Sequence, residues 1–251
     1  MKRFLWFILP IIVSLALWEF VSRSGFTSPA LFPPPSKVAV ALFGMIMAGT
    51  LFSDLRDSLW RLLAGLFIGS AVGVAFGLLT GRIKSFATAL SPIIQLLRPL
   101  PPVAIIPLVI VWFGIDDGAK IFSIAFAVFF PVWINTHIGA HQIPQAFLWG
   151  AKLLTNSSAK IFREVVFPAA LPFTIAGIRT GIAVAFIMVF VAELAGASSG
   201  LGYRISITHL AYRIDEMMAA LMVLGALGAI TDQLFVAGTR KLFPWIKFSS
   251  K

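Results

Sequence analysis

Histidine, cysteine and carboxylate side chains most often carry catalysis or bind metals, and this chain has few of them. Its 251 residues include three histidines, ten acidic residues and no cysteine. His137 and His141 are four residues apart and would share a helix face, but no glutamate-containing metal motif accompanies them. The sequence has neither a Gly-x-x-x-x-Gly-Lys-Ser/Thr phosphate loop nor a nucleophile–base pair. We therefore expect a non-catalytic protein that binds no metal and no cofactor.

Four ionisable residues lie within or at the ends of long apolar runs: Glu19, Arg98, Arg179 and Glu193. Such residues are costly inside a bilayer and indicate function by default. Arg98 begins the sequence RPLPP, and we expect it to line an anion path together with Pro101 and Pro102. Arg179 and Glu193 lie about 21 Å apart along a helix, so they share a face without touching. These two residues either line the path or form polar contacts between helices.

The elements that hold these residues are predicted to be membrane-spanning helices. The chain is 59% hydrophobic and 12% charged, against about 45–50% and about 25% for soluble domains. We expect an all-α integral membrane protein, a single domain over residues 1–251 with its core spans at about 62–240. Residues 1–21 resemble a signal peptide without a small-x-small cleavage site, which favours a retained first span. Six spans are predicted by hydropathy, at about residues 4–21, 62–80, 86–113, 121–136, 172–191 and 217–236.

Two of these spans have unusual patterns. Four glycines recur every four residues in the second span: Gly65, Gly69, Gly73 and Gly77. One helix face is then nearly bare backbone, which predicts a tight seam with another helix. The third span is interrupted by residues 98–102 and by Pro107, and proline removes backbone donors. Because lipid cannot satisfy the freed carbonyls, we expect this break to lie inside the helix bundle.

The basic residues are distributed unequally between the two sides of the predicted membrane. Eleven of the twenty lysines and arginines fall on the side of the N-terminus, where only about one acidic residue joins them. The opposite side has seven basic and six acidic residues. The positive-inside rule therefore predicts that both termini are cytoplasmic. It also explains the net charge of +10, so nucleic acid is not expected as a partner.

A polar segment at about residues 144–168 lies between the fourth and fifth spans, on the predicted cytoplasmic side. Apolar and basic residues alternate along it with helical character, and Ser157 could cap a second short helix that begins near Ala159. We expect a short helical hairpin that presents a firm knob to a cytoplasmic partner. The alternative is an ordinary loop at the lipid surface.

The same segment resembles a loop of the permease subunits of bacterial binding-protein-dependent ABC importers. That loop reads Glu-Ala-Ala, three residues, Gly, nine residues, Ile-x-Leu-Pro. Leu171 and Pro172 match its end, whereas residues 149–151 and Thr155 stand where Glu-Ala-Ala and Gly are expected. The stretches 98–122, 162–179 and 191–203 are similar to the nitrate/sulfonate/taurine branch of this family.

The resemblance implies a type I ABC importer permease fold in a bacterial inner membrane. It implies a homodimer that binds two cytoplasmic ATPases, which themselves bind ATP and Mg, and that receives cargo from an extracytoplasmic binding protein. The residues expected to contact the ATPases are Phe147, Leu148, Ala151, Lys152, Leu154, Thr155, Lys160, Ile161 and Arg163. The loop GASSGLG at residues 196–202, with Ser198, Ser199 and Gly200 at its centre, is expected to be a gate or a contact for the binding protein. A plain connector is the alternative.

The expected cargo is a small anion or polar organic solute of the nitrate, sulfonate, taurine or bicarbonate class. A thiamine-precursor pyrimidine and riboflavin are alternatives. Two rival functions are a self-sufficient secondary transporter or channel, which would need internal repeats and membrane carboxylates, and an integral-membrane enzyme.

Overall fold

The computed structural model describes residues 2–25, 28 and 30–245, and of residues 2–8 the backbone alone. Of the residues described, 85% are helical, and none lies in a β-strand. The helices, including the 3₁₀-helix η1 and the π-helix η2, are α1 (Lys2–Arg23), α2 (Pro35–Met47), α3 (Thr50–Arg82), α4 (Lys84–Leu97), η1 (Pro102–Ile105), α5 (Ile106–Phe113), α6 (Asp117–His141), α7 (Gln145–Leu154), α8 (Ser158–Ile161), η2 (Phe162–Val166), α9 (Phe167–Gly196), α10 (Leu201–Leu210) and α11 (Ile214–Leu242).

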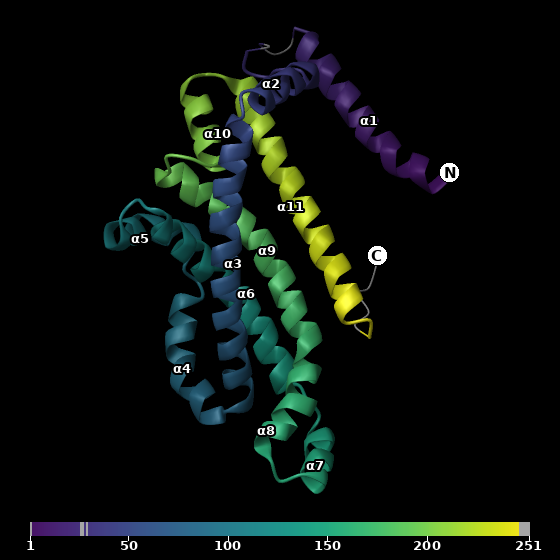
Figure 1. The fold of residues 1–251 in the computed structure, drawn as a ribbon, viewed down its shortest axis with the longest axis vertical. Coiled ribbons are helices and arrows are strands. Elements are labelled where there is room, and N and C mark those ends of the chain that lie inside the picture. Colours follow the sequence, from purple (N-terminus) through teal and green to yellow (C-terminus); the bar gives the residue numbers. More distant parts are fainter. Residues whose placement is uncertain (1, 26–27, 29, 246–251) are drawn as a thin grey trace.

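Helices α3 and α6 form the central pair of the bundle, and the glycines of α3 bring them into contact (Figure 1). A Cβ atom at Gly65 would lie 2.6 Å from Ile124, and one at Gly77 would lie 2.5 Å from Thr136. These distances leave no room for a methyl group, so the backbone of α3 lies directly on α6. The predicted glycine seam is confirmed, and it continues for one more turn to Gly81.

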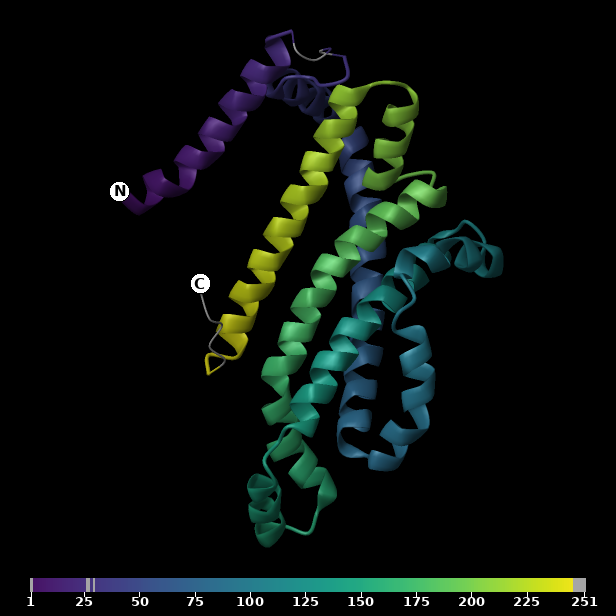
Figure 2. The ribbon, with the colours of Figure 1, turned by 180° about the vertical axis from the view of Figure 1, so that it is seen from behind.

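Helix α9 packs against another face of α6, and α11 lies beside α9 (Figure 2). The α6–α9 contact again depends on small residues, because a Cβ at Gly139 would lie 2.7 Å from Phe173 and one at Gly177 would lie 2.9 Å from Asn135. The core of the bundle lies where these helices meet. Its most deeply buried apolar side chains include Leu62, Ile124, Val128, Val132, Met188, Val189 and Leu201.

All six predicted spans coincide with described helices, and five of them meet the length and hydropathy needed to cross a membrane. Four helical segments are long and apolar enough to cross a membrane: α3, α6, the continuous helix Ser158–Gly196, and α11. The helices Lys84–Leu97 and Pro102–Phe113 together form a broken span, bent by 83°. These are the second to sixth predicted spans. The first predicted span coincides with α1, and the side chains of residues 2–8 lie outside the described part.

The break in the third span lies at the proline-rich sequence, as predicted. Helix α4 ends at Leu97, and η1 begins at Pro102. Residues 98–101 are exposed on the single chain, so the prediction that the bundle would enclose this break is wrong for one chain. Part of its backbone is paired locally, since the amides of Arg98 and Leu100 donate to the carbonyls of Ile94 and Leu97.

The two ends of the bundle have different structures. Helices α7 and α8 form the lower tip of the molecule, whereas α2, α10 and the first turns of α3 and α11 gather at the upper end (Figure 1). The 39-residue helix Ser158–Gly196, which includes α8, η2 and α9, connects the tip to the upper half. This continuous helix makes a mechanical link between the two ends.

Candidate functional site

The lower tip is a two-helix hairpin, as predicted from residues 144–168. Helix α7 ends at Leu154, and the Ser157 hydroxyl accepts a hydrogen bond from the Lys160 amide at 3.3 Å. The predicted N-cap of the second helix is therefore confirmed. The hairpin has a small apolar core of its own, made by Ile143, Leu148 and Val166. That core gives the tip a defined shape.

The exposed surface of this hairpin differs in detail from the predicted contact surface. Leu154 is 88% exposed and Phe147 is 66% exposed, whereas Leu148 is only 5% exposed. Leu148 therefore stabilises the hairpin and does not point outward as an anchor. The neighbouring Leu153 is 89% exposed. Leu153 was not among the predicted contact residues, although two consecutive leucines after Lys152 at the end of a helix are a recognisable signal.

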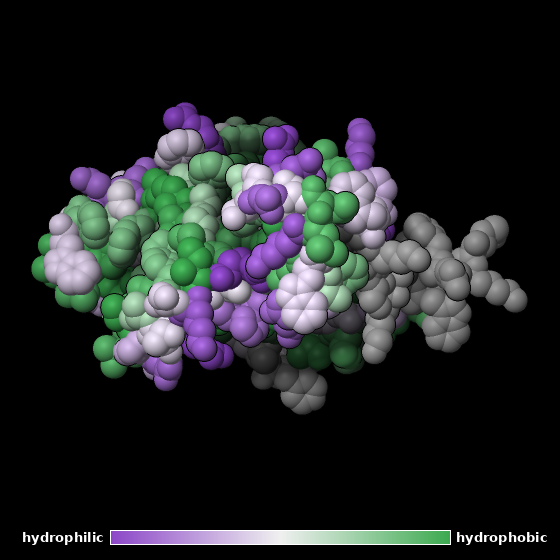
Figure 3. Space-filling model, turned by 90° about the horizontal axis from the view of Figure 1, so that it is seen from below, coloured by the Kyte–Doolittle hydropathy of each residue, from purple (hydrophilic) through white to green (hydrophobic). Residues whose placement is uncertain are grey.

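A cavity of 420 Å³ opens between α7 and the start of the long helix. Six of the nine predicted contact residues line it: Phe147, Ala151, Leu154, Thr155, Lys160 and Ile161. Lys152 and Arg163 are exposed outside this cavity. Seen from the hairpin end, hydrophilic and hydrophobic residues are intermixed (Figure 3). A surface of this kind can bury apolar anchors within a charged rim.

Thr155 stands where the family loop has a glycine, and the backbone explains why a side chain fits there. Thr155 is the C-cap of α7 and is extended, with φ −158° and ψ 141°. Any residue adopts this conformation, and glycine is needed only where φ is positive. The turn between α7 and α8 thus forms without the glycine of the family motif.

Near the upper end of the bundle, a buried polar cluster joins α3 to α9. The Glu193 carboxylate is 1% exposed. It accepts hydrogen bonds from Arg61 Nη1 at 2.8 Å, from the Ser58 hydroxyl at 2.8–2.9 Å and from the Gly202 amide at 2.9 Å. Arg61 also donates to Asp117 at 2.7 Å. Since every charge is paired, this cluster can persist away from water.

The same cluster holds the glycine-rich loop in place. Arg61 donates to the Ser199 carbonyl at 2.7 Å, and Asp54 accepts from the Gly200 amide at 3.0 Å. Gly200 has φ +115°, and a Cβ there would overlap the Glu193 carboxylate. Only glycine fits this position. In this conformation the loop is clamped to α3, and its role as a moving gate stays a prediction.

Asp54 and Arg61 belong to the charged stretch that precedes the second predicted span, yet both are buried. They are 3% and 4% exposed. With Ser58 they recur at intervals of four and three residues, on the face that continues as the glycine seam. This spacing was the available signal, because polar residues in line with a buried stripe are themselves expected to be buried.

Arg179 belongs to a separate ion pair. It donates to Asp232 of α11 through two hydrogen bonds, each 2.7 Å long. The two side chains are 45% and 36% exposed on the single chain. Arg179 does not contact Glu193, as predicted. Asp232 lies inside the sixth predicted span and was omitted from the ionisable residues of the spans.

Glu19, at the end of α1, accepts hydrogen bonds from Arg23, at 2.6 Å, and from the amide and hydroxyl of Ser36. This carboxylate therefore joins α1 to the first turn of α2. Glu19 was not among the residues predicted to line the translocation path.

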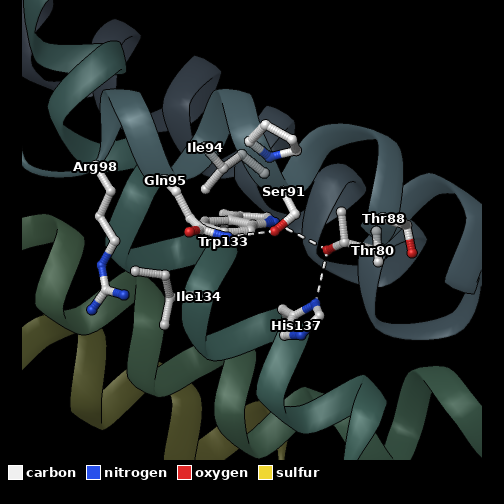
Figure 4. A pocket seen from close by; sticks show the side chains of 11 residues that line it. Thr80, Thr88, Ser91, Ile94, Gln95, Arg98, Trp133, Ile134 and His137 are labelled. Carbon is white, nitrogen blue, oxygen red and sulfur yellow. Dashed lines mark hydrogen bonds between the residues drawn. The ribbon is translucent and has the colours of Figure 1, made fainter.

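An open cavity of 620 Å³ lies between α4 and α6, and we call it the α4–α6 groove (Figure 4). Its lining residues are Thr80, Ala87, Thr88, Ser91, Pro92, Ile94, Gln95, Arg98, Trp133, Ile134 and His137. The Trp133 indole donates to the Thr80 hydroxyl at 3.0 Å, and His137 Nδ1 lies 2.9 Å from the same oxygen. Arg98 thus lines this groove, whereas Pro101 and Pro102 lie beyond its lining. The anion path expected along these three residues stays a prediction.

His137 and His141 lie together on α6. The rings of His137 and His141 stack 5.7 Å apart, nearly parallel. No group of three or more histidine, cysteine or carboxylate residues with ligand geometry occurs among the described residues.

Together, these features define a polytopic α-helical membrane protein with an exposed helical hairpin at one end and a clamped loop toward the other. The family described as "Binding-protein-dependent transport system inner membrane component" matches residues 69–242. The match covers more than half of the chain, and the chain belongs to this family.

Relatives match over nearly the whole chain. The putative aliphatic sulfonates transport permease protein SsuC of Bacillus subtilis (strain 168) is 33% identical over 247 residues, which are 97% of this chain and 89% of that protein. The taurine transport system permease protein TauC of Escherichia coli (strain K12) is 32% identical, over 93% of this chain and 86% of the relative. The nitrate import permease protein NrtB of Synechocystis sp. (strain PCC 6803) is 31% identical, over 90% of this chain and 84% of that protein. The predicted family and its nitrate/sulfonate/taurine branch are confirmed.

Solved structures have the same fold. The MetNI methionine ABC transporter, in an inward-facing conformation, gives a TM-score of 0.63 at 18% identity, over 80% of this chain and 98% of that chain. An amino acid ABC transporter crystallised with histidines gives a TM-score of 0.61 at 19% identity, over 80% of this chain and 96% of that chain. The predicted all-α permease fold is thus confirmed.

Proposed function

We propose that this chain is the membrane permease of an ATP-driven importer and that the α7–α8 hairpin receives the force of a separate ATPase. The observation that carries the proposal is the exposure of Leu153 and Leu154, 89% and 88%, at the tip of a basic hairpin. Large apolar side chains exposed together and rimmed by polar residues are typical of a surface that binds a partner. Two ATPase subunits, binding ATP and Mg, are the partners of this surface.

The long helix Ser158–Gly196 supports a coupling mechanism. It begins in the hairpin and ends three residues after Glu193, which is bonded to α3. A displacement of the hairpin by the ATPases is therefore transmitted along one continuous helix to the clamped loop. This helix converts ATP-driven closure at the hairpin into rearrangement near the other end of the bundle.

A second copy of the chain completes the transporter in this proposal. Two features of the single chain support it. The proline-rich break at residues 98–101 is exposed, and the Arg179–Asp232 pair is roughly half exposed at mid-span. Neither feature is stable against lipid. A homodimer with a polar path between its halves covers both.

The proposed cargo is a small anion or polar organic solute delivered by an extracytoplasmic binding protein. The names of the relatives, which cite aliphatic sulfonates, taurine and nitrate, support this class. A thiamine-precursor pyrimidine or riboflavin is the alternative cargo. The proposed location is the bacterial inner membrane, with both termini cytoplasmic because the basic residues cluster on their side.

Leu154→Asp tests the coupling surface in the assembled transporter. We expect the variant to fold and to lose at least about tenfold of the co-purified ATPase, because a buried carboxylate without a partner is strongly unfavourable at an interface. Leu210→Asp is the matched control, since Leu210 is 75% exposed on α10, at the opposite end. Full ATPase recovery with Leu154→Asp would refute the proposed surface. Uptake into liposomes without ATPase, driven by an ion gradient, would instead favour a secondary transporter.

A further inference from the structure

One face of α4 carries a polar stripe. Thr88, Ser91, Gln95 and Arg98 follow one another at intervals of three, four and three residues, so they lie on one face of the helix. All four line the α4–α6 groove. No residue of α4 is fully buried, and large apolar residues such as Ile93 and Leu96, 54% and 73% exposed, lie outside the groove lining.

The opposing wall of the groove is aromatic. Trp133 and His137 are one turn apart on α6, and their rings lie 6.1 Å apart. Trp133 Nε1 and His137 Nδ1 are both engaged with the Thr80 hydroxyl. That contact holds the two rings in place beside the α4 stripe (Figure 4). Ile134 on α6 and the α4 residues Ala87, Pro92 and Ile94 complete the apolar part of the lining.

The charge and size of the groove restrict what it can bind. Arg98 is the only lining residue with a fixed charge, and no carboxylate is among the described lining residues. A guanidinium with neighbouring hydroxyl and amide donors suits an oxyanion. The cavity of 620 Å³ is within the range of organic ligand sites, which are mostly apolar with a few polar groups. A bare inorganic anion would leave the apolar wall uncovered.

We propose that the α4–α6 groove is a substrate subsite for an organic oxyanion that has an apolar body. The sulfonate or carboxylate head binds Arg98 with Gln95 and Ser91, and the alkyl or ring portion lies against Trp133. This inference rests on the proposed permease function and names its substrate class. It also assigns Arg98 a direct role in recognition.

The absence of cysteine from the chain makes a direct test possible in the assembled transporter without ATP. Ser91→Cys and Gln95→Cys place a thiol in the groove, and Ile93→Cys and Leu96→Cys place one elsewhere on α4. The reagent is a sulfonate-bearing, membrane-impermeant methanethiosulfonate. We expect the groove thiols to react at least about tenfold faster than the other two, because the thiolate forms readily only in contact with water.

The same samples test which class of ligand binds the groove, because a bound ligand protects the introduced thiol from modification. We expect 1-butanesulfonate to slow the modification of Ser91→Cys at least about fivefold. Potassium nitrate at equal ionic strength should have little effect, because nitrate has no alkyl chain to cover the apolar wall of the groove. Adding Arg98→Gln should abolish the protection. Arg98→Lys should retain part of it, because lysine keeps the charge without the planar donors.

Three outcomes would overturn the subsite. Equal, slow labelling of all four positions would mean that lipid fills the groove. Rapid labelling of Ser91→Cys without protection by butanesulfonate would exclude binding there. Equal protection by nitrate would exclude an organic class. Each of these results leaves ATPase recovery with Leu154→Asp unaffected, so failure of the subsite and failure of the permease proposal are distinguishable.

Discussion

Replacement of Glu193 by alanine should strongly destabilise the protein, because it removes the centre of the buried cluster. The carboxylate is 1% exposed and accepts from Ser58, Arg61 and Gly202. Its loss leaves Arg61, itself 4% exposed, with Asp117 as its nearest carboxylate at 2.7 Å. Breaking a buried pair from one side costs about 3–5 kcal/mol.

The expected shift follows from the size of the chain. For 150–250 residues, 1 kcal/mol corresponds to about 2–4 °C in Tm. The Glu193→Ala variant should therefore melt roughly 6–20 °C below the parent. The Tm of Glu193→Gln should lie between those of the parent and of Glu193→Ala, because the glutamine amide keeps the shape and one acceptor oxygen. Tryptophan fluorescence during heating of the purified protein measures the transition.

The control is an exposed ion pair near the same end of the bundle. Lys37 lies 3.9 Å from Asp215, and its side chain is 55% exposed. Surface pairs contribute about 0–1 kcal/mol, so Lys37→Gln should shift Tm by no more than about 4 °C. A Glu193→Ala shift within the control's range would show that the cluster adds nothing to stability. In that case, contacts other than those of Glu193 hold the glycine-rich loop at residues 196–202 against α3.

Three further predictions concern the bundle and the hairpin. Gly77→Ala should lower Tm by several degrees because the Cβ would lie 2.5 Å from Thr136, whereas Gly225→Ala, where the site is open, should leave Tm equal or slightly higher; equal shifts would contradict the seam. Arg179→Leu should reduce the yield of folded protein, because it leaves Asp232 unpaired in the membrane. The double variant Arg179→Leu/Asp232→Leu should restore the yield of folded protein, measured by size-exclusion chromatography. If the double variant does not restore the yield, the two residues do not act as a pair. Ser157→Ala should destabilise the hairpin by about 0.5–2 kcal/mol, seen as faster amide exchange in α8 alone, and unchanged exchange would show that the cap is dispensable.

Local patterns in the sequence were sufficient to predict the helices and several of their contacts. Apolar runs gave the second to sixth spans, and RPLPP marked where α4 ends. The four-residue glycine repeat predicted the α3–α6 seam before its partner helix was known. These signals are reliable because helix period, bilayer thickness and proline geometry act within one element. The hairpin cap at Ser157 is local for the same reason.

The stripe on α4 was equally local, yet it was missed. Thr88, Ser91 and Gln95 are uncharged, and an inventory of ionisable residues draws attention only to Arg98. Helical spacing alone would have placed all four on one face. What spacing could not give is the opposing wall, because Trp133 lies on a helix whose rotation depends on packing.

The sequence by itself thus determined the membrane-spanning helices, the position of the break, the polar hairpin and the glycine face. Only the tertiary structure decided which distant charges pair, since Arg61 and Glu193 are 132 residues apart and Arg179 and Asp232 are 53 apart. It also decided that Leu148 faces inward while Leu154 faces outward. The physical reason is that periodicity defines a face within one helix, whereas the rotation and depth of each helix relative to its neighbours come from packing the whole bundle.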